Sequence, residues 1–127
     1  ELLATSDYVS LHVPLTKDTR HMIGREQFAQ MKPTAYLINT ARGGLIDTAA
    51  LAAALNAGQL AGAALDVQDP EPPDLSQPPY NDHRVIITPH AAFVSEESLA
   101  ILRQRVAAQV ATRLTGGVPE NVVNGVL

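Results

Sequence analysis

Three ionisable residues that could act together on a small anion follow apolar segments of the chain: Arg42, Glu71 and His90. An arginine can hold a carboxylate through two parallel hydrogen bonds. A histidine gives or takes a proton near neutral pH, and a glutamate on its other ring nitrogen would orient it and favour its charged form. The pair Gly43-Gly44 would leave the end of the segment before it without side-chain cover. This set suits a substrate with a carboxylate beside a carbonyl or hydroxyl group.

Such a set does not reduce a ketone by itself, because no side chain supplies hydride. A nicotinamide cofactor is the usual source. Each residue also has an ordinary structural interpretation. An arginine after a strand is more often a surface ion pair, a glutamate in a proline-rich loop is usually solvated, and a histidine after Thr-Pro caps a turn as readily as it catalyses. Asp66 could simply accept from nearby backbone amides. Only the joint placement of these residues favours chemistry.

The pattern of apolar segments and helix caps predicts how these residues are positioned. Strands are expected at residues 8–13, 35–40, 62–67 and 85–88, and helices at residues 25–31, after an Asp47 cap, and after a Ser95 cap. Strands that lack two-residue alternation and are separated by helices predict a parallel sheet covered on both faces. In such sheets ligands bind beyond the carboxyl ends of the strands. We therefore expect Arg42, Asp66, Glu71 and His90 at one edge.

Composition narrows the function classes. The chain has 127 residues, a net charge of −4 and no cysteine. We expect one domain with a real core, no basic face for nucleic acid, no membrane span and no thiol chemistry, in a cytoplasmic protein. The histidines have no metal-ligand spacing, so no metal site is predicted. The chain starts without methionine on what resembles the end of a helix, and we expect a fragment of something longer.

Several motifs together resemble one family. "LHVPLTKDTRHMIG", "MKPTAYLINTARGGLIDTAALAAAL", "GQLAGAALDVQDPEP" and "VIITPHAAF" are similar, in order and spacing, to the C-terminal half of the NAD-binding domain of D-isomer-specific 2-hydroxyacid dehydrogenases. The similarity covers nearly the whole chain and is closest to members of the C-terminal-binding-protein and phosphoglycerate-dehydrogenase type. It implies an α/β fold with a partial Rossmann-type parallel sheet, divided into residues 1–94 of the dinucleotide-binding domain and residues 95–127 returning to the substrate domain.

The resemblance also implies a role for each site residue. Arg42 would hold the substrate carboxylate, His90 would donate or accept the proton, and Glu71 would pair with His90. Asp66 would bond the nicotinamide carboxamide. The residues implied at the NAD site are Val13, Pro14, Leu15, Thr16, Thr40, Ala41, Arg42, Asp66, His90, Ala92 and Phe93.

Departures from the family pattern concern the substrate pocket and the missing half of the cofactor site. Gln68 stands where an apolar residue, often phenylalanine, is common, and Phe93 stands where many members have a glycine-containing turn. No Gly-x-Gly-x-x-Gly occurs in the chain, so the choice between NAD and NADP cannot be read from it. The resemblance implies NAD, the family's commoner cofactor.

Three functions remain open at this point, and the presence of Arg42, Glu71 and His90 together favours the first of them. The first is part of an oxidoreductase that interconverts a small 2-ketoacid and a D-2-hydroxyacid. The second is an NAD-sensing, corepressor-like binding module, and the third is a truncated, inactive domain. The resemblance implies that the strand at residues 8–13 lacks the neighbouring strand it has in the family. This open edge and an apolar helix stripe together predict a homodimer or other self-association. The stripe comprises Leu99, Leu102, Val106, Val110 and Leu114.

Overall fold

The computed structural model describes residues 1–123 and divides the chain into two compact units, residues 1–92 and the residues from 93 onward. The predicted division after residue 94 stays a prediction. Each unit is described separately below.

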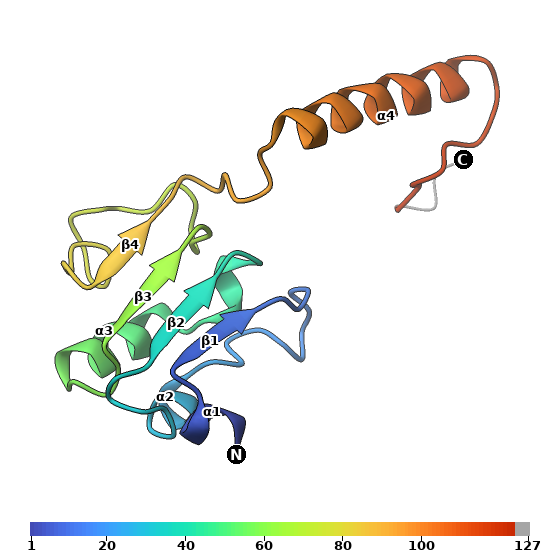
Figure 1. The fold of residues 1–127 in the computed structure, drawn as a ribbon. Coiled ribbons are helices and arrows are strands. Elements are labelled where there is room, and N and C mark those ends of the chain that lie inside the picture. The colour runs from blue at the N-terminus through green and yellow to red at the C-terminus, as the bar shows by residue number, and fades with distance from the viewer. Residues whose placement is uncertain (124–127) are drawn as a thin grey trace. The chain divides into compact units, whose positions relative to one another are not determined.

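The first unit is built on a parallel sheet of four strands, in the order β1-β2-β3-β4 (Figure 1). The strands are β1 (Tyr8–Leu11), β2 (Tyr36–Asn39), β3 (Gly62–Leu65) and β4 (Val85–Ile87). The helix α1 (Leu2–Thr5) precedes β1, and the connections between strands hold α2 (Arg25–Phe28), the 3-10 turn η1 (Gly43–Leu45) and α3 (Thr48–Asn56). The predicted α/β fold with a Rossmann-type parallel sheet is confirmed.

The core lies between one face of this sheet and the helices α2 and α3 (Figure 1). Phe28 of α2, Leu37 of β2 and Leu51 of α3 are almost completely buried. Burying a side chain of this size contributes about 1.5–3 kcal/mol, so this layer stabilises the sheet whose strand ends carry the site.

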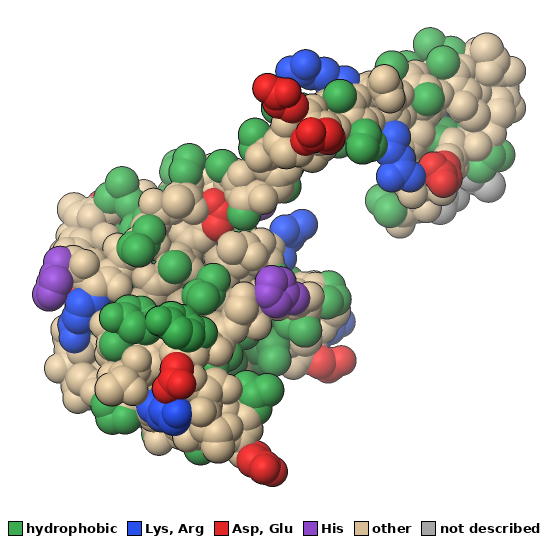
Figure 2. Space-filling model, in the orientation of Figure 1, with side chains coloured by type: hydrophobic (Ala, Val, Ile, Leu, Met, Phe, Trp, Pro, Cys, Tyr) green, Lys and Arg blue, Asp and Glu red, His purple; other side chains and the backbone are tan. Residues whose placement is uncertain are grey.

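The other face of the sheet differs from the prediction that both faces are covered. Tyr8 is 70% exposed and Ile86 is 67% exposed, and the rings of Tyr8 and Tyr36 stack with their centroids 5.8 Å apart. Figure 2 shows hydrophobic side chains gathered over the strands on this side. The sequence pattern marks both faces as apolar, but the chain supplies a helical layer for only one of them within this unit.

Element ends follow local signals closely at α3 and less closely elsewhere. Asp47 caps α3 by accepting from the Ala50 amide at 3.0 Å, and Gly58 ends it with a φ of 66°, both as predicted. The helix expected at 25–31 ends at Phe28, because the next residues turn through i→i+3 bonds. Likewise β1 ends at Leu11 and not at residue 13.

The second unit contains the long helix α4 (Glu96–Leu114). The Ser95 side chain caps it by accepting from the Ser98 amide at 3.0 Å, and Gly116 follows its end with a φ of 84°. The predicted apolar stripe is present but not buried; Val106 and Val110 are each 54% exposed. Residues 124–127 of the predicted tail lie outside the described residues. Among residues 1–123 no helix is long and apolar enough to cross a membrane.

Candidate active site at the carboxyl edge of the sheet

The parallel strands bring three of the predicted site segments to one edge of the sheet. Arg42 follows β2, the segment from Asp66 to Glu71 follows β3, and His90 follows β4. Since neighbouring strands are hydrogen-bonded in the order of the sequence, these segments are neighbours in space. The first unit therefore presents an arginine, two carboxylates and a histidine along a single edge.

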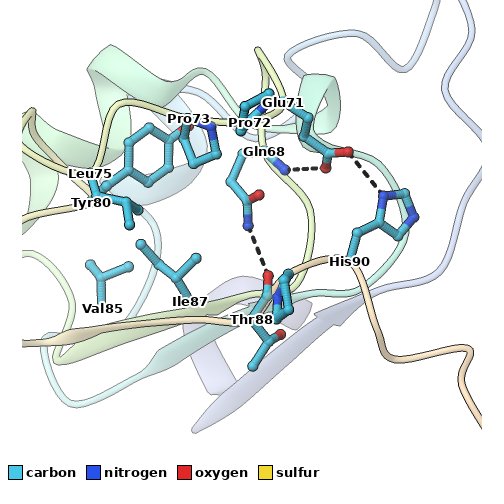
Figure 3. A pocket seen from close by; sticks show the side chains of 11 residues that line it. Gln68, Glu71, Pro72, Pro73, Leu75, Tyr80, Val85, Ile87, Thr88 and His90 are labelled. Atoms are coloured by element: carbon cyan, nitrogen blue, oxygen red, sulfur yellow. Dashed lines mark hydrogen bonds and ion pairs between the residues drawn. The ribbon is translucent and has the colours of Figure 1, made fainter.

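Glu71 and His90 form a direct pair. Glu71 Oε2 lies 2.9 Å from His90 Nδ1, and Glu71 Oε1 accepts from the Gln68 backbone amide at 2.8 Å (Figure 3). The Gln68 N–H, then the bond to His90, and more weakly the charge of Arg42 lower the pKa of Glu71. An ionised carboxylate only accepts, so Nδ1 carries the proton in this contact. The opposite ring nitrogen, Nε2, lies on the side of the ring away from Glu71.

The backbone at His90 is in an uncommon conformation. Its φ is 53°, in the left-handed region that residues other than glycine rarely adopt. Its N–H donates to the Thr88 carbonyl at 3.0 Å, and Pro89 between them ends the strand. Such local strain persists only where surrounding contacts hold it, and it is common at functional sites.

Asp66 is one of these surrounding contacts. It is buried, and its carboxylate accepts from the Thr88 hydroxyl and from the amides of Ala91 (2.9 Å) and Ala92 (2.8 Å). Burial alone would raise the pKa of Asp66, but these three hydrogen bonds outweigh it and lower the pKa. The backbone-binding alternative considered for Asp66 is thus present. A carboxylate has about four acceptor positions, so one is left for the predicted carboxamide contact.

We expect Asp66→Asn to destabilise the full-length protein by about 2 kcal/mol at pH 7, because the buried network loses its charge and one of its two acceptor oxygens, and an NH2 group then faces an N–H or O–H donor. The pKa of Asp66 is lower in the folded protein than its ordinary value of 3.8. Its stabilisation is therefore complete above about pH 5 and is lost as the pH falls through the folded value. Urea unfolding from pH 7 to pH 3 should show a shallower acid dependence in Asp66→Asn. The exposed Asp18→Asn is the control, and parallel curves for the wild type and Asp66→Asn would contradict the assignment.

Arg42 is held through its backbone by Asn39, a residue that the sequence analysis missed. Asn39 is completely buried; its Oδ1 accepts from the Ala41 amide at 3.0 Å and its Nδ2 donates to the Arg42 carbonyl at 2.9 Å. The sequence signal that could have indicated this role is the presence of an amide side chain inside the apolar run before Arg42. The exposed Arg42 side chain donates Nη1 to the Ala41 carbonyl at 2.6 Å. A guanidinium has five N–H donors, so others remain for an anion.

Gly43 and Gly44 serve packing, which corrects the prediction that they leave bare backbone at the strand end. A Cβ on Gly43 would lie 2.1 Å from the Gln68 carbonyl carbon and oxygen. Gly44 is buried, and a Cβ there would lie 3.0 Å from Leu15 Cδ2 and 3.1 Å from Asp69 Oδ2. Both glycines let the turn after β2 approach the turn after β3.

We expect Gly43→Ala to destabilise the protein by about 2 kcal/mol or more, because backbone atoms must move to admit the methyl group. Thermal unfolding of the full-length protein measures this. Gly24→Ala is the matched control, because a Cβ there meets its nearest atoms at an ordinary 3.6 Å. Equal melting temperatures for the two variants would contradict the close approach at Gly43.

A hollow of about 270 Å³ lies at the strand ends and includes three of the predicted cofactor residues, Thr40, Asp66 and Ala92. The rest of its lining is mostly apolar: Ile38, Ala64, Leu65, Ile86, Thr88 and Ala91. The predicted residues 13–16 form the loop after β1, where Val13 is 37% and Leu15 38% exposed. Phe93 is 56% exposed and begins the second unit. Their roles stay predictions.

Comparison with known proteins shows the family to which this chain belongs. Residues 1–92 match the family of the D-isomer specific 2-hydroxyacid dehydrogenase, NAD binding domain. The chain belongs to this family. The dehydrogenase resemblance predicted from the sequence motifs is thus confirmed.

The relatives of this dehydrogenase domain include enzymes named for different substrates. It is 48% identical to a glyoxylate reductase of Korarchaeum cryptofilum over 98% of the chain, and 48% identical to a D-3-phosphoglycerate dehydrogenase of Methanocaldococcus jannaschii. The chain spans 37% and 24% of the length of these two proteins. Among solved structures it matches the NAD complex of a D-isomer specific 2-hydroxyacid dehydrogenase from Lactobacillus delbrueckii ssp. bulgaricus. That match has a TM-score of 0.80 and 40% identity, and covers 95% of this chain and 41% of the other.

Proposed function

We propose that this chain is part of a longer NAD-dependent dehydrogenase that interconverts a small 2-ketoacid and its D-2-hydroxyacid, and that it carries the acid–base residues of that enzyme. The observation that carries the proposal is the 2.9 Å contact of Glu71 with His90 Nδ1 at the edge where Arg42 also emerges. A proton donor beside a carboxylate-binding cation fits a substrate in which carboxylate and carbonyl are adjacent.

The residues at the strand ends fit a nicotinamide ring and its carboxamide. The hollow lined by Thr40, Asp66 and Ala92 has mostly apolar walls, and Asp66 keeps an acceptor position for an amide N–H. When bound, NADH supplies the hydride that no side chain can. We infer that Asp66 and the loop at residues 13–16 contribute to holding the cofactor.

In this proposal the chain's own residues do three things. Arg42 binds the substrate carboxylate through guanidinium N–H groups. His90 donates a proton from Nε2 to the forming hydroxyl oxygen in ketoacid reduction and accepts it in the reverse direction. Glu71 stays ionised, because its pKa is lowered, and keeps the imidazole oriented through Nδ1.

The test is an assay of the full-length protein with NADH and NADPH. The names of the relatives suggest glyoxylate as the first oxidant, and D-glycerate and D-lactate with NAD⁺ for the reverse reaction. Turnover with any of these pairs supports the proposal. NADH binding without turnover of these substrates would favour the corepressor-like binding module, and neither binding nor turnover would favour the inactive domain. The homodimer and the cytoplasmic location stay predictions.

A further inference from the structure

Gln68 is a buried polar side chain at the junction of the loops that carry Glu71 and His90. We propose that Gln68 is a positioning residue, which ties the end of β3 to the end of β4 so that the Glu71 carboxylate stays aligned with His90 Nδ1. This inference rests on the proposed function for its effect on turnover. Its effect on the Glu71–His90 contact can be observed without any turnover.

The side-chain amide of Gln68 contacts backbone carbonyls at the ends of both β3 and β4. Its Nε2 donates to the Leu65 carbonyl at 3.1 Å and, more weakly, to the Thr88 carbonyl at 3.4 Å. Thr88 N–H also donates to the Leu65 carbonyl, at 3.1 Å. The amide thus reinforces the last backbone bond of the β3–β4 pair, two residues before His90.

The backbone of Gln68 makes the contact that reaches Glu71. Its N–H donates to Glu71 Oε1 at 2.8 Å, while Glu71 Oε2 lies 2.9 Å from His90 Nδ1. One residue therefore contacts both ends of the pair: its side chain holds the segment that leads to His90, and its main chain holds the carboxylate. Figure 3 shows both directions, with the amide pointing toward Thr88 and the Glu71 carboxylate toward the imidazole.

Packing alone does not fix Gln68 in this place. On one side Gly43 lies against its backbone, so movement in that direction is blocked. Gln68 also borders an open cavity of about 580 Å³, and the walls on that side include Leu75, Tyr80 and Ile87. A side chain of similar size without an amide could move into this space at little cost. We infer that hydrogen bonding, and not close packing, sets the position of residue 68 on this side.

The test uses Gln68→Met in the full-length protein, because methionine keeps the length of the side chain and removes the donor. We expect kcat to fall about tenfold through misalignment of the acid–base pair, with the KM for NADH unchanged. The NMR resonance of the His90 Nδ1 proton should broaden or move, because the segment that leads to His90 loses its bond to the residue 68 side chain and shifts relative to Glu71. Gln68→Leu is the second variant if Gln68→Met does not fold.

Two controls separate positioning from general damage. Gln77→Met changes an exposed glutamine of the same loop and should leave kcat and the resonance unchanged. In a Glu71→Gln background, Gln68→Met should have little further effect on kcat, because residues that act through one contact are not additive.

An unchanged His90 resonance in folded Gln68→Met or Gln68→Leu would overturn the inference. So would an equal loss of kcat with and without Glu71. If the wild type shows no turnover, the proposed function fails, and the resonance alone then decides the role of Gln68.

Discussion

Replacing His90 with glutamine should remove nearly all turnover of the full-length protein, by a factor of about 10²–10⁴ in kcat. Glutamine keeps a polar side chain of similar reach at the end of β4, but it neither donates nor accepts a proton at the reacting oxygen near neutral pH. NADH binding should change little, because the predicted cofactor contacts involve several other segments. Steady-state kinetics of ketoacid reduction and NADH fluorescence titration measure the two effects separately.

The control for this substitution is His83→Gln. The His83 side chain is 91% exposed and precedes β4, at the opposite edge of the sheet from His90. It should keep wild-type turnover. Turnover in His90→Gln within a few-fold of the wild type would exclude His90 as the acid–base residue and would leave the Glu71–His90 pair with a structural role only.

Replacing Arg42 should weaken the use of substrate more than any other change outside the acid–base pair. We expect Arg42→Ala to lower kcat/KM by about a hundredfold, equivalent to about 3 kcal/mol of lost charged hydrogen bonding. Arg42→Lys should be nearly as impaired, because an ammonium group cannot form the planar two-bond contact of a guanidinium. Initial rates across a range of ketoacid concentrations give kcat/KM directly.

Arg25→Lys provides the matched control for Arg42→Lys. Arg25 is an exposed arginine at the start of α2, away from the strand ends. It should behave as the wild type in the same assay. Near wild-type kcat/KM in Arg42→Lys would show that the site does not need a guanidinium and would remove Arg42 from the proposed carboxylate contact.

Much of the site follows from order along the chain. Local composition predicts the three segments that carry the site: the apolar run before Arg42, the acidic loop after residue 65, and the Thr-Pro-His sequence after the last strand. A parallel sheet turns this order into proximity, because its strands all end at the same edge. The placement of Glu71 near His90 could therefore be predicted before any distance was known.

Other features depend on contacts between segments distant in sequence. Gly43 is a glycine because the backbone of Gln68 packs against it, and nothing near residue 43 indicates that partner. The residue types around Asp66 allow either bonds to backbone amides or a ligand contact; the structure shows three donors already on its carboxylate. Both polar atoms of the Asn39 side chain form hydrogen bonds within the turn that carries Arg42.

By itself, then, the sequence determined the succession of strands and helices, the caps at Asp47 and Ser95, and which ionisable residues meet at the carboxyl edge. These depend on local propensity and on the two-way choice between parallel and antiparallel pairing. Only the tertiary structure decided which polar side chains are already satisfied, which glycines are needed for close approach, and that the helices of residues 1–92 cover only one face of the sheet. The physical reason is that hydrogen-bond partners and interatomic gaps of a few ångströms arise between loops that only the folded sheet brings together.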